Sequence, residues 1–465
     1  MPATLGAVTL RTAVALAAGK IARIGLQRLG RGATALPGLV TLTIDPSALG
    51  RMTAAFAHGA VLVSGTNGKT TTSRMLADIA RAAGWSPVHN RSGSNLDRGI
   101  AAELIARSGW TGRPAGDVGI FEVDEASVPR LLAKLEPRAV VVLNLFRDQM
   151  DRYFELAQLA RRIAVSFSAL TSATTLVLNA DDPLVVHLGD RHPGRILHFG
   201  IDDAAVGGQI AQNISDATHC PRCRTRLHYR RVILGHVGDW SCPSCGFARP
   251  KPDVAATRIE LGPGGTVLHI AGTTDPVAVP LPGLYNSYNA LAALAAARAL
   301  DIAQPTAVRA IAAFKPAFGR LEVIEADGRR LRLVLVKNPA GFNAAIASLL
   351  EQGGTHRLLA ALNDRDADGR DVSWIWDADF EALAPAVEHA VVTGLRGRDL
   401  ALRLKYAGVP RERMEVVDGW AAAIERAIGT APAGSEVVVL TTYTALLALR
   451  GELARMGHVG QFWED

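Results

Sequence analysis

VLVSGTNGKTTT, residues 61–72, is the stretch from which the fold can be inferred. Residues 60–63 are apolar or small and predict a short buried strand, which a glycine-rich turn follows. The run from Thr71 to Ala83 then places its apolar residues on one helical stripe. A strand–loop–helix of this kind points several backbone N–H groups and a helix N-terminus at one place. Such a loop suits a phosphate chain.

We predict that this loop binds a chain of phosphates. Lys69 would neutralise the terminal phosphates, and the Thr70 hydroxyl would be a ligand of Mg²⁺. The full P-loop pattern has a glycine five residues before Gly68, where this chain has Val63, so GTNGKT is a shorter variant. A chance Gly-Lys-Thr in an ordinary loop is the alternative. The nucleotide-binding residues predicted in the loop are Gly65, Thr66, Asn67, Gly68, Lys69, Thr70 and Thr71.

The bulk composition is that of a globular protein with several domains. The chain has 465 residues, which indicates two to four domains with ample core. Hydrophobic residues make up 49% and charged residues 20%, and the formal charge of +6 is modest for this length. That balance fits an anionic substrate or a membrane surface, and we expect no nucleic-acid partner. No apolar run reaches the roughly 18 residues that a spanning helix needs.

The N-terminal part, residues 1–50, is expected to begin with a basic amphipathic helix. An apolar stretch from Thr12 to Gly19 is surrounded by basic residues: Arg11, Lys20, Arg23, Arg28 and Arg31. The segment before Arg11 is uncharged, the apolar core is short and no cleavage site follows, so a secretory signal is not indicated. We expect a cytoplasmic protein. The helix either rests peripherally on the anionic inner face of the membrane or packs on its own domain.

Apolar strands and helical segments alternate after the loop, which predicts a parallel, doubly wound α/β sheet. The strand at 118–123 ends in acidic residues. Open α/β sheets bind ligands at the carboxyl ends of their strands, so Glu122 is our candidate for a second Mg²⁺ ligand. Asp124 and Glu125 lie behind it. The alternative is that these carboxylates only cap the next helix.

Four cysteines form two C-x₂-C pairs separated by 18 residues. Two such pairs can meet as a tetrahedral Cys₄ zinc ribbon, and we place this insertion at about 216–250. A closed set of four thiolates favours a structural metal. Redox-active pairs are the alternative, and the arginines around the cysteines are interpreted as a solvated face. The predicted zinc ligands are Cys220, Cys223, Cys242 and Cys245.

Two residues late in the central domain, residues 51–325, are candidates for nucleotide contact. Asn286, in GLYNSYN before an alanine-rich helix, would place its amide against the base. Arg320, in FGRLE, would place its guanidinium near the ribose or phosphates.

A second alternation of strands and helices begins near residue 326 and predicts a C-terminal α/β domain, 326–465. Its pattern is Rossmann-like, although it lacks GxGxxG. The loop at 363–381, NDRDADGRDVSWIWDADFE, holds six aspartates and two tryptophans. Folding alone does not readily explain this composition. A solvated turn that caps the next helix is the alternative.

The order of these motifs resembles a known family. GTNGKTTT, a glutamate at a strand end, NLFRDQMD, GLYNSYNALAA and FGRLE are similar to the central domain of Mur ligases. Those enzymes form amide bonds by activating a carboxylate as an acyl phosphate. The Cys₄ insertion, VKNPAGFN and DADGRDVSWIWDADFE resemble, more narrowly, the MurT family of lipid II isoglutaminyl synthase subunits. The resemblance implies a Mur ligase-type central P-loop domain with a zinc-ribbon insertion and a C-terminal α/β domain.

The resemblance also implies residue roles and a reaction. Lys69 and Thr70 would hold phosphates and Mg²⁺, with Glu122 as a further Mg²⁺ ligand; Asn286 would face adenine and Arg320 the nucleotide. Lipid II would be amidated with ATP at the α-carboxylate of its D-glutamate, in peptidoglycan biosynthesis. The chain departs from Mur ligases at Gln149, where they carry histidine, and at Val336-Lys337, where they carry a DYAHNP-type stretch. Both departures fit a nucleophile as small as ammonia.

Ammonia requires a source, and we expect a separate GatD-like glutaminase subunit. A glutaminase usually needs a cysteine nucleophile, and all four cysteines of this chain are assigned to metal. In the MurT family an aspartate completes the partner's Cys–His pair, because a carboxylate orients the histidine and stabilises its cation. Asp371 is our first candidate for that aspartate and Asp368 our second.

Three other functions remain open at this point. The chain could be a Mur- or folylpolyglutamate-type ligase that adds an amino acid. It could be an ATPase whose zinc ribbon binds nucleic acid, although weak charge and little interleaving of aromatic and basic residues count against this. It could also be a degenerate ligase kept as a scaffold, against which Lys69 and Glu122 argue.

Overall fold

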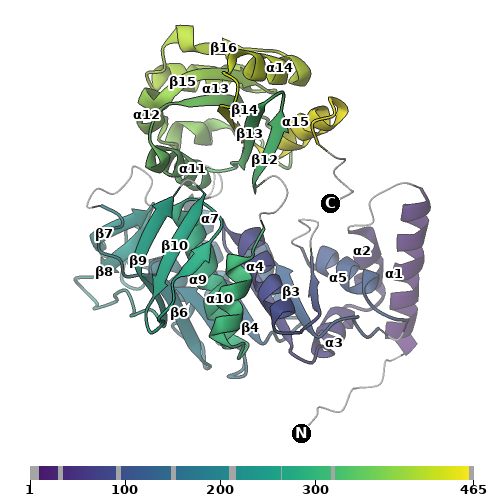
Figure 1. Ribbon diagram of the computed structural model, residues 1–465. Coiled ribbons are helices and arrows are strands. Elements are labelled where there is room, and N and C mark those ends of the chain that lie inside the picture. Colours follow the sequence, from purple (N-terminus) through teal and green to yellow (C-terminus); the bar gives the residue numbers. More distant parts are fainter. Residues whose placement is uncertain are drawn as a thin grey trace.

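The computed structural model describes residues 10–29, 35–90, 96–110, 112–147, 153–208, 216–262, 264–315 and 320–459. These residues form two α/β units, one on a nine-stranded sheet and one on a six-stranded sheet (Figure 1). The α/β class predicted from the alternating pattern is confirmed.

The larger sheet is mixed, with strand order β11-β10-β9-β6-β5-β4-β1-β3-β2. Strands β1 to β6 pair in parallel, and β9 pairs with β6 in parallel. The β9–β10 and β10–β11 pairs are antiparallel. Its strands are β1 (Ala60–Ser64), β2 (Pro87–His89), β3 (Val118–Glu122), β4 (Ala139–Val142), β5 (Thr175–Asn179), β6 (Ile196–Ile201), β9 (Val254–Gly262), β10 (Gly265–Ile270) and β11 (Val277–Val279).

Helices cover both faces of this sheet, because its strands are apolar on both sides. Val61 and Val63 belong to one buried cluster and Leu62 to the other, as the two-residue period of a strand requires. On the first face lie α4 (Lys69–Ala82), α9 (Leu284–Ala299) and α10 (Gln304–Ala312). On the second lie α3 (Ala48–Ala54), α5 (Asp97–Ala106), α6 (Val128–Leu132), α7 (Tyr153–Ser168) and α8 (Pro183–Leu188), with the short 3₁₀ helix η1 (Glu125–Ser127) before α6.

Two N-terminal helices, α1 (Leu10–Arg28) and α2 (Leu36–Ile44), form an outer layer on α5 (Figure 1). The helices approach closely at Gly19, where an added Cβ would lie 2.1 Å from Thr41 Oγ1. Thr12 Oγ1 donates a hydrogen bond to the buried Asp45, 2.8 Å away. The helix predicted at the N-terminus therefore packs on its own domain through one face. It is not amphipathic as predicted, because its outer face is apolar as well. No described helix is long and apolar enough to cross a bilayer.

The smaller sheet has the order β12-β13-β17-β14-β15-β16, with an antiparallel β12–β13 hairpin and otherwise parallel pairs. Its strands are β12 (Arg320–Ala326), β13 (Arg329–Leu335), β14 (His356–Ala361), β15 (Val387–Thr393), β16 (Met414–Val416) and β17 (Glu436–Thr441). One face packs on α11 (Pro339–Gln352), η3 (Ser373–Asp377), α12 (Phe380–Leu383) and α13 (Gly397–Tyr406). The other face packs on α14 (Trp420–Thr430) and α15 (Tyr443–Arg455); the remaining 3₁₀ turns are η4 (Ala384–Ala386) and η5 (Arg411–Arg413).

The change from one sheet to the other falls between α10 and β12. We therefore propose to divide the chain a few residues before the boundary at 325/326 that the sequence predicts, because β12 pairs only within the smaller sheet. A third, two-stranded sheet, β7 (His228–Leu234) and β8 (Val237–Ser241), lies between β6 and β9 in the chain.

Candidate active site

The loop between β1 and α4 depends on glycine at two positions. Gly65 and Gly68 have φ of 137° and 90°, a region that residues with a Cβ rarely adopt. The space is also closed, since a Cβ on Gly65 would lie 2.9 Å from Leu143 Cβ, and one on Gly68 would lie 2.1 Å from Asn289 Oδ1. The two glycines therefore let the backbone turn tightly into the N-terminus of α4.

The segment after β4 holds both residues between the glycines, Thr66 through backbone groups and Asn67 through the side-chain amide of Asn144. Asn144, which follows β4, accepts a hydrogen bond from Asn67 N at 2.9 Å and donates one to Asn67 O at 3.1 Å. Thr66 N donates to Asn144 O at 3.1 Å, and Thr66 Oγ1 accepts from Phe146 N at 2.9 Å. Because these contacts join the ends of two parallel strands, the loop is preorganised rather than free.

Lys69 is buried and paired with a carboxylate. Its Nζ lies 3.0 Å from Glu125 Oε2 and donates to Gly65 O at 2.5 Å. Burial alone would lower the pKa of Lys69, but the charges of Glu125 and Glu122 outweigh it and the pKa is raised. Burial acts to raise the pKa of Glu125, but Lys69 and Lys337 outweigh it and the pKa is lowered. The ammonium and the carboxylate therefore stay charged together at neutral pH.

Thr70 and Glu122, the two predicted Mg²⁺ ligands, meet. Thr70 Oγ1 donates a hydrogen bond to Glu122 Oε2 at 2.8 Å. Glu122 ends β3 next to Val63 of β1, and its backbone is held by Asn90, which exchanges hydrogen bonds of 2.8 and 2.9 Å with it. A hydroxyl and a carboxylate oxygen side by side at the N-terminus of α4 are a donor set that suits Mg²⁺.

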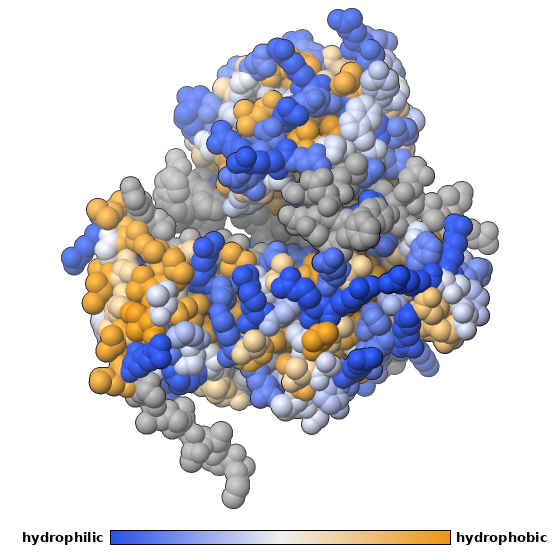
Figure 2. Space-filling model, turned by 180° about the vertical axis from the view of Figure 1, so that it is seen from behind, coloured by the Kyte–Doolittle hydropathy of each residue, from blue (hydrophilic) through white to orange (hydrophobic). Residues whose placement is uncertain are grey.

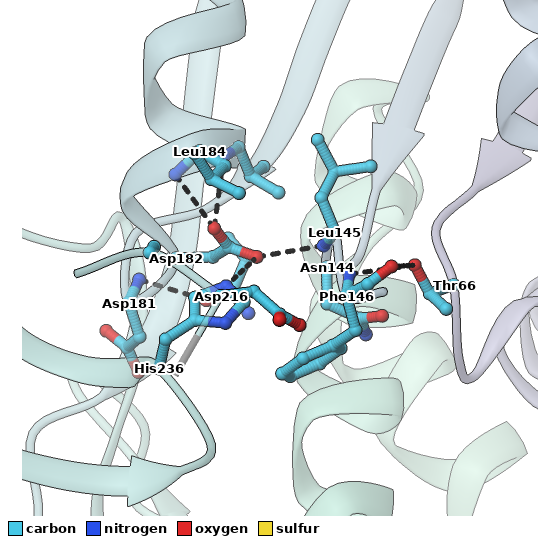
Figure 3. Close-up of polar contacts among 12 residues, drawn as sticks. Thr66, Asn144, Leu145, Phe146, Asp181, Asp182, Leu184, Asp216 and His236 are labelled. Atoms are coloured by element: carbon cyan, nitrogen blue, oxygen red, sulfur yellow. Dashed lines mark hydrogen bonds and ion pairs between the residues drawn. The ribbon is translucent and has the colours of Figure 1, made fainter. Parts of the chain in front are cut away.

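The Cys₄ insertion reaches the loop through a buried histidine (Figure 3). His236, in the turn between β7 and β8, is fully buried, with Nε2 3.3 Å from Asp182 Oδ2 and its ring 4.7 Å from that of Phe146. Burial lowers the pKa of His236, but Asp182 outweighs it and the pKa is raised. Asp182 also accepts from Leu145 N at 2.9 Å. The insertion thus braces the same segment that holds Thr66.

The smaller unit contributes residues to the edge of the loop. Asn338 caps α11 by accepting from Gly341 N at 2.7 Å, and its Nδ2 lies 3.4 Å from Asn67 Oδ1. The charge of Lys337, next to it, acts on Asp124 and Glu125 and opposes the rise in pKa that burial causes there. The site therefore lies where the two units meet.

The four cysteines converge on one point. Their Sγ atoms all lie within 4.8 Å of one another, with 3.6 Å between Cys220 and Cys245 and 3.4 Å between Cys223 and Cys242. Each cysteine contacts one from the other C-x₂-C pair, as the predicted pairing of two knuckles requires. Cys220 and Cys242 are buried, and burial raises the pKa of the Cys220 thiol to about 12. Four converging thiols are a donor set that suits a tetrahedral metal.

The two candidate aspartates in the loop after β14, Asp368 and Asp371, differ in burial and in hydrogen bonding. Asp368 is buried and accepts hydrogen bonds from Thr444 N at 2.6 Å, Thr444 Oγ1 and Arg365 N at 3.2 Å. Asp371 is only half-buried, and Ser373 N donates to its Oδ1 at 2.8 Å. Asp368 therefore holds the loop onto α15. The carboxylate of Asp371, just before η3, remains partly exposed to solvent.

Two parts of the chain match known families. Residues 63–228 match the Mur ligase middle domain, and residues 335–446 match the MurT ligase C-terminal domain. The MurT subunit of lipid II isoglutaminyl synthase (glutamine-hydrolyzing) from Staphylococcus aureus strain N315 is 32% identical over 457 residues, 97% of this chain and 99% of that relative. The chain belongs to the MurT family.

A second MurT subunit and a solved structure of similar fold are also similar to this chain. The MurT subunit of Streptococcus pneumoniae strain ATCC BAA-255 / R6 is 34% identical over 452 residues, 96% of this chain and 98% of its own. A pseudomurein peptide ligase type C from Methanothermus fervidus has a similar fold, with a TM-score of 0.65 and 23% identity, covering 85% of this chain and 78% of the other. The chain is accordingly an ATP-dependent ligase of the Mur type.

For the two late nucleotide-contact candidates of this MurT-family chain, the structure describes the side chain of Asn286 but not that of Arg320. Asn286, predicted to face adenine, is buried at the start of α9, where its amide donates to Pro282 O at 2.7 Å and accepts from Asn289 Nδ2 at 3.0 Å. It would have to leave these partners to reach a base. Arg320 begins β12, and its side chain lies outside the described residues, as does Gln149.

Sequence reasoning did not single out three residues that shape the site. Asn144 was visible as a polar residue at a strand end, the position at which ligand-binding residues gather. Asn338 and His236 lie in other parts of the chain, and no local pattern connects them to the loop. Lys337 was noted only as a departure from the Mur ligase stretch.

Proposed function

We propose that this chain amidates the α-carboxylate of D-glutamate in the stem peptide of lipid II, at the cytoplasmic face of the membrane. The observation that carries the proposal is the phosphate loop, in which a buried Lys69 and the Thr70–Glu122 pair lie side by side. The names of the MurT relatives supply the substrate, lipid II, and the role of glutamine. The missing DYAHNP-type stretch is consistent with a small nucleophile.

In the proposed reaction the substrate carboxylate attacks the γ-phosphorus of ATP, and ADP leaves. Ammonia then adds to the carbonyl carbon of the acyl phosphate, orthophosphate leaves with the bonding pair, and a proton is lost. The α-amide of D-isoglutamine remains. Free ammonia is scarce at neutral pH because most is ammonium, so a supply close to the site is needed.

The residues of the loop would act mainly by electrostatics. The N–H groups at the start of α4 would bind phosphate oxygens, and the Lys69 ammonium would stabilise charge on the transferring phosphoryl group. Thr70 and Glu122 would hold Mg²⁺, which would supply positive charge against the phosphates. Glu125 keeps Lys69 in place and protonated.

The four thiols are proposed to bind one structural Zn²⁺. Two of them are buried, and the set leaves no open coordination position, which argues against catalysis by this metal. Metal analysis of the purified chain should find about one zinc per chain, and Cys220→Ser should lose it. A chain that is metal-free and equally stable would exclude this site.

A separate glutaminase is proposed as the partner. The chain has four cysteines, and all four converge on the candidate metal site, which leaves no thiol for glutamine hydrolysis. Asp371 is proposed to orient the histidine of the partner's Cys–His pair, since Asp368 is occupied by three hydrogen bonds.

The test is amidation of lipid II by the purified chain with ATP and ammonium chloride, and then with glutamine and a co-purified glutaminase. Lipid II labelled with ¹⁸O in the α-carboxylate should transfer one label to orthophosphate, since the acyl oxygen leaves with phosphate. ATP turnover that requires an added amino acid and ignores ammonia would favour an amino-acid ligase instead.

A further inference from the structure

The outer face of α1 is apolar, although it faces solvent. Leu10, Val14, Ile21 and Ile24 recur at helical spacing, and 83%, 52%, 65% and 43% of their surfaces are exposed. The opposite face, which includes Thr12, Ala15, Leu16 and Gly19, is the one buried on α2 and α5. Packing within the chain therefore accounts for one face of α1 and leaves the other unexplained.

The apolar surface continues beyond α1. About half of the surface of Leu36 and Leu39, on α2, is exposed. In the segment after α5, about two thirds of the surface of Trp110 is exposed. Figure 2 shows hydrophobic residues gathered at the edge of the molecule that α1 forms. We call these seven residues, from α1, α2 and Trp110, the α1–α2 face. Contiguous apolar surface of this kind marks an interaction site.

The charge around the α1–α2 face has one sign. Residues 10–44 contain five basic residues and no acidic residue. Three of the basic side chains bind backbone carbonyls rather than carboxylates: Arg11 to Ile44 O at 2.6 Å, Lys20 to Ser108 O at 2.6 Å and Arg23 to Ala106 O at 3.3 Å. The carboxylates on the neighbouring α5 are already paired, Asp97 with Lys134 and Glu103 with Arg107. Among the described residues, no ion pair joins these three basic side chains to a carboxylate.

We propose that the α1–α2 face docks on the anionic surface of a lipid bilayer, with α1 lying parallel to the surface. Apolar side chains would enter the headgroup region, and the basic side chains at the rim would meet lipid phosphates. A second copy of this chain is a poorer occupant, because two faces of like charge would oppose each other. The proposal rests on the proposed function in one respect: a lipid-linked substrate gives the enzyme a reason to be held at a bilayer.

The architecture suits that role. α1 and α2 pack on α5, which belongs to the helical layer on the sheet that carries the phosphate loop. A bilayer bound at this edge would therefore hold the larger unit, and the loop with it, at a constant orientation to lipid-linked substrate. The smaller unit makes no part of the α1–α2 face and stays available to a partner.

The test is sedimentation of the full chain with vesicles that contain phosphatidylcholine alone or with phosphatidylglycerol, without ATP, lipid II or ammonia. We expect binding to the anionic vesicles, weakened by salt. The double variant Val14→Glu, Ile21→Glu should reduce that binding about tenfold or more. Val165→Glu, on α7, is the matched control, since Val165 is an exposed valine (69%) outside the face; it should bind as the wild type does.

Amidation assays separate this proposal from the proposed function. The double variant should raise the KM for lipid II in anionic vesicles and leave ammonia-dependent amidation of a detergent-dispersed substrate unchanged. Equal sedimentation of wild type and double variant would overturn docking, whatever the amidation result. So would a wild-type dimer in analytical ultracentrifugation that the double variant loses, since a second copy would then be the occupant. Vesicle binding in a chain that amidates nothing would leave docking intact and reject the function.

Discussion

Two loops follow inner strands of the two sheets, and they are built differently. The polar side chains of the phosphate loop after β1 are paired within the chain: Lys69 forms an ion pair with Glu125, and Thr70 donates a hydrogen bond to Glu122. In the loop after β14, Asp368 is buried and accepts several hydrogen bonds, whereas Asp371 is half-buried and accepts one from a backbone N–H. We propose that the first loop is a complete site and that the second needs a partner to complete one. The comparison teaches that strand-end position alone does not say whether a loop acts by itself.

The strongest test of the first loop is Lys69→Ala. Loss of the ammonium should reduce amidation about a thousandfold or more, with ammonia and with glutamine alike, because both routes use the same phosphoryl transfer. Orthophosphate release is the measurement. Lys134→Ala removes a lysine that is paired with Asp97 away from the loop and should retain near-wild-type activity. Residual activity of Lys69→Ala near that of the control would end the claim that the first loop is complete.

Asp371→Asn tests the second loop. Glutamine-dependent amidation in the presence of the glutaminase should fall by about two orders of magnitude or more, since the neutral amide cannot stabilise an imidazolium in the partner. Ammonia-dependent amidation should be unchanged. Asp366→Asn is the matched control, because Asp366 is highly exposed and pairs with Arg370 in the same loop. Loss of both activities together would mean that Asp371 supports folding rather than the partner's site.

Glu125→Gln tests the ion pair between Lys69 and Glu125 through the pH dependence of the free energy of unfolding. The variant leaves Lys69 buried without its partner and should lower the free energy of unfolding by about 3 kcal/mol near neutral pH. The lowered pKa of Glu125 means that its contribution is present above its ordinary pKa of 4.5 and is lost as the pH falls through the lowered value. The raised pKa of Lys69 means that its contribution persists below 10.5 and is lost only above that.

Urea unfolding of wild type and Glu125→Gln gives the measurement. The difference between the two should stay constant between about pH 6 and pH 9 and shrink as the solution is made more acidic than about pH 4. A difference that already changes near pH 7 would show that Lys69 or Glu125 is not charged as the structure implies.

Asp368→Asn should have the smallest effect of the four. It weakens charge-assisted hydrogen bonds to Thr444 and Arg365 and should destabilise the smaller unit by about 2 kcal/mol. Thermal unfolding should detect the loss, while glutamine- and ammonia-dependent activities per folded molecule stay near wild type. Selective loss of the glutamine-dependent activity would move the partner's aspartate from Asp371 to Asp368.

Much of the first loop could be predicted because its determinants are local or follow from sheet geometry. The glycines, Lys69 and Thr70 lie in one stretch, and Glu122 could be placed beside them because β3 and β1 are parallel neighbours that end together. The hydrogen bonds of Asn286 were harder to predict, because its amide bonds to Pro282 and Asn289 at the start of the same helix. Asp368 and Asp371 could not be separated, because the deciding partner, Thr444, is 76 residues away from Asp368.

The sequence by itself determined the order of strands and helices, the phosphate-loop motif, the two cysteine pairs and membership of the MurT family. Those features are written in short spacings and in apolar periods of two or about 3.6 residues. Tertiary structure alone decided that His236 braces the loop, that Asn338 meets Asn67 across 271 residues, and which face of α1 remains outside. The physical reason is that such contacts depend on how separate elements pack, and α1 is apolar on both faces, so its own pattern does not say which one is buried.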